Sequence, residues 1–283
     1  MSVLRPDRSR LLDSLRGVAV AAVVVYHAFS LATPEGQSGG ESPWAFLAAG
    51  SLGVDLFFVL SGLLLLTSWE ATRRRHPGLG AAFADFVRRR ALRILPAYWL
   101  SLAVLVPLLA PEILASPGRL GLLLTVQQYL DPALPKTVNV VYWSLTTEVH
   151  FYLLLPALAF ALRRLGSGRF LLACLATSVA WQVMVAPTLP AGWVFGRLDQ
   201  FAAGMVAARI LGGNRRAADL LASPPVRALL GTALVGAAFH LAWRSASGAA
   251  LPGTWLVHPL AGLSIAGLAV AILSSPSRGT TEH

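Results

Sequence analysis

The sequence is short of charge and of cysteine. Asp, Glu, Lys and Arg make up 13% of its 283 residues, about half of the roughly 25% that a soluble domain carries. The single cysteine, Cys174, excludes a disulfide framework and a cysteine metal site. With 55% hydrophobic residues and a mean hydropathy of +0.64, most of the protein surface is expected to face lipid.

Several motifs of soluble enzymes are also missing. The chain has no GxxxxGK phosphate loop, no GxSxG nucleophile elbow, no HExxH zinc motif and no HxxxD pair, which argues against nucleotide hydrolysis and zinc-dependent hydrolysis. What remains is a small set of polar residues inside apolar segments. Such residues are costly in a bilayer and are therefore functional hypotheses.

Eight apolar runs are long enough to cross a hydrocarbon core of roughly 30 Å. They are residues 14–33, 45–68, 91–110, 142–162, 170–188, 196–212, 228–246 and 254–274. The run at 120–130 is too short to span and is expected to form a re-entrant or interfacial helix. The sequence therefore predicts an all-α polytopic integral membrane protein, with a single transmembrane domain over 1–275 and a short cytoplasmic tail at 276–283.

The charge that is present is strongly basic, with 23 Lys and Arg against 13 Asp and Glu and a net charge of +10. These basic residues form short clusters between the apolar runs, which is typical of cytoplasmic loops rather than of a nucleic-acid-binding surface. A cytoplasmic N-terminus places most of them on one side of the membrane. Both termini are therefore predicted to be cytoplasmic.

The first run carries Arg16 and His27. At about 100° per residue the two side chains share one face of a helix, about 16 Å apart along its axis. Asp13 shares that face. A lone histidine at this depth would be interpreted as a packed core residue with a satisfied hydrogen bond.

Glu148 offers His27 a partner. It lies roughly 9 Å into the run 142–162 from the outer end, at the depth expected for His27, and an ionised carboxylate in hydrocarbon needs a partner such as an imidazole. Ser144, Glu148 and Tyr152 recur every four residues and form a polar stripe. We interpret His27 and Glu148 as partners that hold each other's charge and tautomer, with a purely structural Glu148 as the alternative.

Arginines cluster at the cytoplasmic start of the third run. Arg88 and Arg89 are interpreted as topology anchors that bind anionic lipid. Arg90 and Arg93 are one helical turn apart, and Arg93 already enters the membrane. A cation at that depth needs an anion, which a phosphate-bearing cofactor could supply.

Asp55 and Ser61 interrupt the second run, where Gly50, Gly53 and Gly62 are predicted to allow close helix packing. Asp55 lies near the middle of the bilayer and could pair with Arg or His or hydrogen-bond a broken helix, so its role is left open. Later runs carry polar residues at their outer ends that could contact an acceptor or make ordinary interfacial contacts: Arg197, Asp199, His240, Arg244 and His258.

In this order, these segments resemble integral-membrane acyltransferase family 3, the family of bacterial O-antigen acetylases, nodulation-factor acetylases and macrolide acyltransferases. The resemblance covers roughly residues 16 to 210. The matching pieces are Arg16 and His27 with ten residues between them, GVDLFFVLSGLLL at 53–65, Arg90 and Arg93 as RxxR, WSLTTEVHFY at 143–152 and FGRLDQFAAGMVAA at 195–208.

The resemblance implies an O-acyltransferase of the bacterial inner membrane. It implies a cytoplasmic acyl-CoA donor, often acetyl-CoA, no metal, and transfer to a hydroxyl of a carbohydrate or glycosylated acceptor. It makes His27 and Glu148 the catalytic pair and Arg16, Arg90 and Arg93 the donor-binding residues. The residues expected to support them are Asp13, Asp55, Ser61, Trp143, Ser144 and Tyr152. Whether His27 acts as general base or carries the acyl group is open.

The chain departs from the family in one respect. Members usually have about ten spans and a late SYxxYLxH-like segment, whereas this sequence shows about eight spans and no such segment, as expected of a short or truncated member. Two other functions are compatible with buried charges: a transporter or flippase component with an ion relay, and an inactive truncated member.

Overall fold

The computed structural model describes residues 6–32, 44–131, 133–134, 138–185, 193–247 and 254–274, and in these residues the regular structure is helical without strands. The longer helices are α1 (Pro6–Ala32), α2 (Leu52–Arg75), α3 (Leu79–Leu109), α6 (Tyr142–Ala180), α7 (Leu198–Gly213), α9 (Pro224–Ser247) and α10 (Thr254–Ser274). The shorter ones are η1 (Ala45–Ser51), η2 (Pro111–Ala115), α4 (Pro117–Leu124), η3 (Gln128–Leu130), η4 (Trp181–Val185), η5 (Val194–Arg197) and α8 (Arg215–Ala222). The all-α prediction is confirmed.

Six stretches of the described residues are long and apolar enough to cross a membrane. They are Arg10–Ala32, Phe46–Arg75, Leu79–Leu109, Tyr142–Val185, Pro224–Trp243 and Leu256–Ser274. The stretch Tyr142–Val185 contains the predicted run 142–162 and most of 170–188. The run 196–212 corresponds to α7, whose 16 residues are fewer than the roughly 20 that a transmembrane helix needs. The short run 120–130 falls in α4 and η3.

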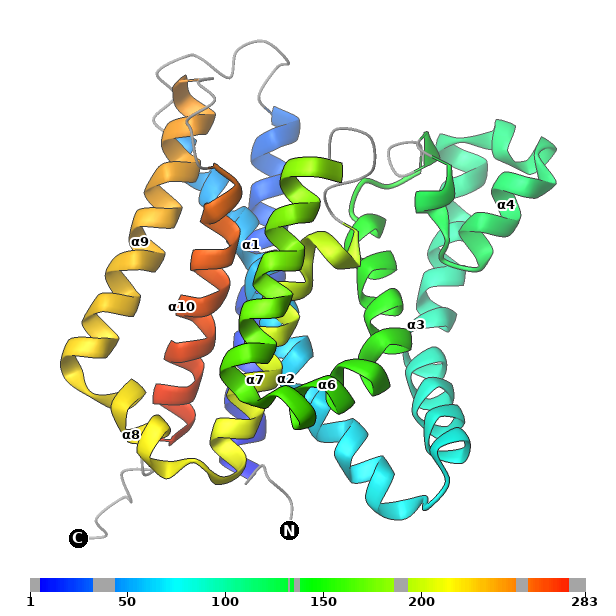
Figure 1. Cartoon of the computed structure of the whole chain (residues 1–283). Helices are drawn as coiled ribbons and strands as arrows, with labels where there is room; N and C mark the ends of the chain where they lie inside the picture. The colour runs from blue at the N-terminus through cyan, green and yellow to red at the C-terminus, as the bar shows by residue number, and fades with distance from the viewer. Residues whose placement is uncertain are drawn as a thin grey trace, which may run out of the picture. The chain divides into compact units, whose positions relative to one another are not determined.

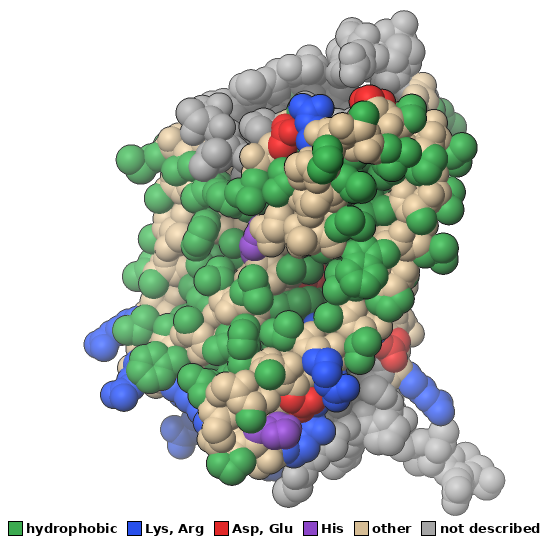
Figure 2. All heavy atoms as spheres, turned by 90° about the vertical axis from the view of Figure 1, so that its right-hand side faces the viewer, with side chains coloured by type: hydrophobic (Ala, Val, Ile, Leu, Met, Phe, Trp, Pro, Cys, Tyr) green, Lys and Arg blue, Asp and Glu red, His purple; other side chains and the backbone are tan. Residues whose placement is uncertain are grey.

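The outward-facing side chains of α3 are those of a lipid-facing helix. Leu92, Leu100 and Leu108 are 64%, 68% and 71% exposed. On the side where α3 and α4 lie, hydrophobic side chains cover the middle of the surface, and most Lys and Arg side chains gather toward one end (Figure 2). An apolar exterior with charge at its end is what a multi-pass membrane protein requires.

The chain divides into two compact units, of which the first comprises Met1–Leu64 and Gln200–His283. In it, α9 and α10 run side by side (Figure 1). The predicted close packing at glycine is confirmed: a Cβ on Gly53 would meet the Ala19 carbonyl and the Val23 side chain, and one on Gly62 would collide with the Phe201 backbone of α7.

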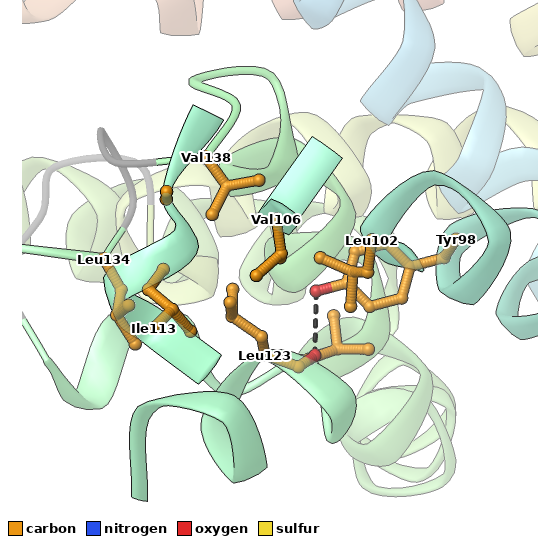
Figure 3. Packing of buried hydrophobic residues seen from close by; sticks show 9 residues of the cluster. Tyr98, Leu102, Val106, Ile113, Leu123, Leu134 and Val138 are labelled. Carbon is orange, nitrogen blue, oxygen red and sulfur yellow. Dashed lines mark hydrogen bonds between the residues drawn. The ribbon is translucent and has the colours of Figure 1, made fainter. Parts of the chain in front are cut away.

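The second unit comprises Leu65–Asp199. Its apolar core joins α3 to the short helices that follow, and Figure 3 shows Leu102, Val106, Ile113 and Leu123 packed together there. The Tyr98 hydroxyl lies beside this core and donates a hydrogen bond of 2.8 Å to the Leu123 carbonyl. The short segment at 117–130 is therefore fixed against α3 by buried contacts.

The helix α6 reverses direction at Gly166. A straight helix would hold Trp143 and Ser178 about 52 Å apart, yet both contact the segment 195–199: Arg197 lies over the Trp143 ring at 5.5 Å, and the Ser178 hydroxyl donates to the Phe195 carbonyl at 3.1 Å. Gly166 has φ 77° and ψ 167°, a conformation that only glycine adopts readily. The helix is thus a hairpin of two arms, as the two predicted runs required.

The predicted tail at 276–283 lies outside the described residues. The single transmembrane domain over 1–275 stays a prediction.

Candidate functional site

His27 has a fixed ring orientation in the first unit. Its Nδ1 lies 2.8 Å from the Val23 carbonyl oxygen on the same helix. A carbonyl oxygen can only accept, so Nδ1 carries the proton and Nε2 of the neutral ring carries the lone pair. The edge of the ring also packs against Tyr26, with centroids 5.0 Å apart. His27 therefore has the satisfied hydrogen bond of a packed residue and also the tautomer of a base.

Arg16 and His27 lie beside the face of α1 that packs against the start of α2. Ala19 and Val23 meet Gly53, and residues 16, 19, 23 and 27 follow one helical stripe. Arg16 is partly buried, and its Nε makes no hydrogen bond to any described residue. Asp13, which was expected to support it, is exposed.

Asp55 joins three helices of the first unit. It is 1% exposed, and its carboxylate accepts hydrogen bonds from Gln200 Nε2 of α7 at 2.5 Å and from His258 Nδ1 of α10 at 3.0 and 3.1 Å. Of the alternatives left open for Asp55, pairing with a histidine is the one observed. Ser61, one and a half turns further along α2, is fully buried.

Glu148 belongs to the second unit and is buried, at 6% exposure. Tyr152, one turn further along α6, is buried as well, whereas the Ser144 hydroxyl at the N-terminal end of the stripe donates to the Val141 carbonyl. The predicted stripe is thus buried at Glu148 and Tyr152 but not at Ser144.

The structure brings Arg90 and Tyr152 to the same aromatic ring. The Phe86 ring is fully buried, packs edge-on against Tyr152 at 6.2 Å, and has the Arg90 guanidinium over it at 5.5 Å. A cation over a ring face is stabilised by the negative potential of that face. Arg93 is exposed on α3.

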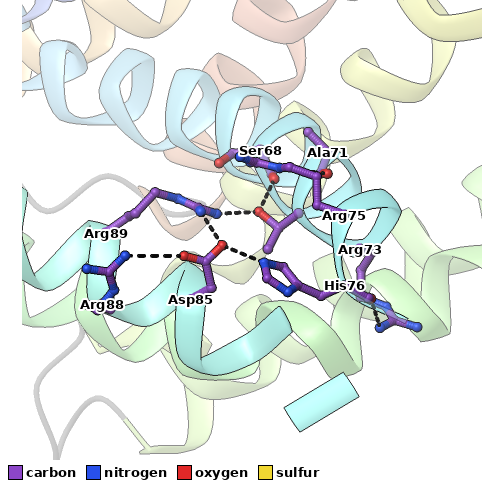
Figure 4. A network of polar contacts seen from close by, with 9 residues as sticks. Ser68, Ala71, Arg73, Arg75, His76, Asp85, Arg88 and Arg89 are labelled. Carbon is purple, nitrogen blue, oxygen red and sulfur yellow. Dashed lines mark hydrogen bonds and ion pairs between the residues drawn. The ribbon is translucent and has the colours of Figure 1, made fainter. Parts of the chain in front are cut away.

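Asp85 organises the corner between α2 and α3, as Figure 4 shows. Its carboxylate pairs with Arg89 and accepts a hydrogen bond from His76 Nε2 at 3.1 Å, and Arg88 lies 3.7 Å away. Arg89 also donates to the Thr72 hydroxyl at 2.5 Å. The guanidinium of Arg89 is therefore occupied by contacts within the protein, and Arg88 is 70% exposed. These two arginines fit the role of topology anchors better than that of donor-binding residues.

Aromatic residues collect at the open end of the α6 hairpin, opposite Gly166. The Trp143 ring lies under Arg197, and its carbonyl accepts a hydrogen bond from the Tyr129 hydroxyl at 3.1 Å. Burial raises the pKa of Tyr129 to about 12, so this hydroxyl keeps its proton and acts as donor. Trp193 packs against Tyr129 and against Trp181, with centroids 6.2 and 5.3 Å apart.

The remaining polar residues, which the sequence predicted at the outer ends of later runs, have separate surroundings. Asp199 is buried and its backbone N–H donates to the Ser178 hydroxyl at 2.9 Å. His240 has a buried Nε2 that forms no hydrogen bond with the residues the structure describes. The side chain of Arg244 lies outside the described part. In the described ranges, no three His, Cys, Asp or Glu side chains gather where they could hold a metal ion.

The sequence did not single out Gln200, Asp85 or Tyr129. Gln200 carried a usable signal, because an amide within an apolar helix needs a partner. Asp85 is an acid between two arginine clusters, and the charge pattern could also have indicated it. The predicted residues of the first unit are Asp13, Arg16, His27, Asp55 and Ser61, and those of the second are Arg90, Arg93, Trp143, Ser144, Glu148 and Tyr152. Their functional roles stay predictions.

Comparison with known proteins gives one family model, described as an acyltransferase domain of family 3, which matches residues 10–278. The peptidoglycan O-acetyltransferase OatA of Listeria monocytogenes is 32% identical over 166 residues, which cover 52% of this chain and 23% of OatA. The O-acetyltransferase OatA of Staphylococcus aureus is 28% identical over 169 residues, covering 54% and 25%.

Nodulation protein 10 of Rhizobium leguminosarum biovar viciae is 29% identical over 190 residues, covering 60% of this chain and 49% of that protein. The chain thus matches about a quarter of each OatA protein and about half of nodulation protein 10. No solved structure matches.

Proposed function

The chain belongs to acyltransferase family 3, and from this premise we propose that it is a membrane-bound O-acyltransferase that moves an acyl group, in the first instance acetyl, to a hydroxyl of a carbohydrate or glycosylated acceptor. The observation that carries the proposal is the match of the acyltransferase domain to residues 10–278. Two relatives that are O-acetyltransferases support an acetyl group and an oxygen acceptor.

The proposed donor is a cytoplasmic acyl-CoA, gripped through its phosphates by Arg16, Arg90 and Arg93. Arginine suits this task because its planar guanidinium binds phosphate with two parallel hydrogen bonds. Arg16 supports the assignment with a buried Nε that has no hydrogen-bond partner in the described residues, and Arg93 with an exposed side chain. Arg88 and Arg89 are left out because Asp85 and Thr72 engage Arg89.

In the proposed chemistry, His27 is the general base. Its Nδ1–H is donated to the Val23 carbonyl, so Nε2 is free to take the proton of the acceptor hydroxyl. The hydroxyl oxygen then bonds to the acyl carbon, the thioester C–S bond breaks, and the imidazolium returns its proton to the leaving thiolate. Glu148 is proposed to orient the base and to stabilise its cationic form.

The proposed location is the bacterial inner membrane, with both termini in the cytoplasm. The donor would then reach the arginines from the cytoplasm, and the acceptor would meet His27 in the outer half of the membrane. The apolar exterior and the clustering of basic residues between apolar runs support this arrangement.

The test uses the full chain in proteoliposomes supplied with radiolabelled acetyl-CoA and an added oligosaccharide. We expect His27→Ala and Glu148→Ala each to lower acyl transfer by at least about 100-fold, with unchanged insertion into the membrane. His76→Ala is the matched control, because His76 contacts Asp85 and lies outside the proposed donor, catalytic and acceptor residues. An active His27→Ala protein would contradict the mechanism, and passage of oligosaccharide without consumption of acetyl-CoA would favour a transporter.

A further inference from the structure

Asp55, Gln200 and His258 form a polar triad within the first unit that the proposed chemistry does not use. The three residues come from α2, α7 and α10, and the carboxylate of Asp55 accepts a bond from each of the other two. Asp55 and Gln200 are buried at 1% and 0% exposure, while the His258 side chain is 28% exposed. His258 is therefore the member of the triad that another molecule can reach.

The triad fixes which nitrogen of His258 is available. An ionised carboxylate can only accept, so Nδ1 carries the proton that is shared with Asp55. Nε2 of the neutral ring then presents a lone pair, and no described residue hydrogen-bonds to it. Nε2 of His258 is therefore a hydrogen-bond acceptor on a ring whose orientation Asp55 and Gln200 fix.

The packing of α1 gives the level of the triad. Gly50 lies against Ala22 and Tyr26, and Gly53 lies against Ala19 and Val23, so the two segments run in opposite directions. Asp55, two residues beyond Gly53, is therefore level with the turn of α1 that follows Arg16. The triad lies between the level of Arg16 and the level of His27.

An acyl-CoA donor that is gripped at Arg16 and reacts at His27 must pass its pantetheine arm through this level. The arm contains two amide groups, and an amide that is taken from water without a new hydrogen bond is destabilised. Resting on the proposed function, we propose that His258 Nε2 accepts a hydrogen bond from an amide N–H of the pantetheine arm. Asp55 and Gln200 are its positioning residues.

Gly262 leaves room for the side chain of Gln200. It lies one turn after His258 on α10, and a Cβ there would be 3.0 Å from the Cγ of Gln200. The space left by the missing side chain lets Gln200 reach Asp55. The Oε1 of Gln200 is buried and has no hydrogen-bond partner in the described residues, so the amide is oriented by its single bond to Asp55 and by packing.

The test compares two acyl donors with the full chain in proteoliposomes: acetyl-CoA, which has the pantetheine arm, and phenyl thioacetate, which has no amide. We expect His258→Leu to raise KM for acetyl-CoA about tenfold, the size of one hydrogen bond, with kcat changed less than about twofold. The use of phenyl thioacetate should not change. His258→Gln, which keeps an acceptor oxygen, should restore most of the affinity for acetyl-CoA.

The positioning residues are tested by the same comparison of KM for acetyl-CoA with the use of phenyl thioacetate. Asp55→Asn keeps an oxygen for the Nδ1–H and should leave KM for acetyl-CoA within about threefold of wild type, whereas Asp55→Ala should raise it as His258→Leu does. Thermal unfolding in detergent accompanies each variant, and the Gln and Asn variants keep the test valid if an apolar variant does not fold.

Four outcomes would overturn the inference. An equal loss with both donors would give His258 a chemical or purely structural role. A raised KM for the oligosaccharide alone would assign His258 to the acceptor. Wild-type use of phenyl thioacetate but not of acetyl-CoA would reject the pantetheine contact and keep the acyltransferase, while a wild-type protein that uses neither donor would reject the proposed function and this inference with it.

Discussion

At the scale of single residues, His27 and His258 are held in the same way. Each donates its Nδ1–H to a fixed oxygen, the Val23 carbonyl in one case and the Asp55 carboxylate in the other. In a neutral imidazole this leaves Nε2 as the acceptor. The difference between them lies in the partner: a backbone carbonyl only orients the ring, whereas a carboxylate also carries charge. The two residues are therefore suited to separate tasks.

Asp131 provides a pH-dependent contact in the segment between α4 and α6. The Ala133 backbone N–H donates to Asp131 at 3.0 Å and the Arg119 side chain donates at 2.8 Å. The first of these bonds, and then Arg119, lower the pKa of Asp131 below its ordinary value of 3.8, against a partial desolvation that raises it. The contact is complete above that ordinary value and is lost as the pH falls through the lowered pKa.

We therefore expect the amide protection factors of residues 117–131 to be constant from pH 7 to pH 5 and to fall only at more acidic pH. Hydrogen exchange followed by mass spectrometry measures this in detergent micelles. Asp131→Asn should lower the protection at pH 7 and remove its acid dependence. Unchanged protection in this variant would show that the contact does not order the segment.

At the scale of elements, the contact between α2 and α7 depends on glycine. A methyl group on Gly62 would collide with the Phe201 carbonyl, so Gly62→Ala should destabilise the folded protein by about 1–3 kcal/mol, as overpacking does in other cores. A lower thermal unfolding midpoint in detergent is the expected result.

Gly231 on α9 is the matched control, since a Cβ there would have no atom within 4 Å. Gly231→Ala should leave the midpoint unchanged or raise it slightly, because alanine favours a helix over glycine by about 1 kcal/mol. Equal thermal unfolding midpoints for the Gly62→Ala and Gly231→Ala variants would contradict the prediction. They would mean that the close approach of α2 and α7 contributes nothing to stability.

The sequence pattern predicted most helices because an apolar run of about 20 residues specifies a span by itself. It placed the third apolar run at 91–110, and the helix that contains nearly all of this run begins earlier, at Leu79, since the arginine-rich segment before the run continues the helix outside the apolar region. The same pattern showed Asp55 to be costly but could not show its partners. Gln200 and His258 lie far along the chain, and only the tertiary packing brings them to Asp55.

At the scale of the whole molecule, the distribution of arginine predicts one orientation in the membrane. We expect a fluorescent protein fused after His283 to fluoresce in the cytoplasm, and alkaline phosphatase fused there to be inactive. Fusions within residues 117–131 should give the opposite pair of results. A phosphatase that is active at the C-terminus would reverse the orientation and place the arginines on the wrong side for a cytoplasmic donor.

The hydrogen bonds of Asp55 also have a consequence for the insertion of the protein into the membrane. The ribosome delivers α2 to the membrane before α7 and α10 exist, so Asp55 enters the bilayer without the two side chains that later bind it. A lone aspartate at the centre of a helix opposes insertion by about 2.5–3.5 kcal/mol, which the leucines and phenylalanines around it must offset. The carboxylate of Asp55 is therefore fully bonded only after α10 has been synthesised, and a nascent chain that stalls before α10 would present a partly satisfied acid to the quality-control proteases.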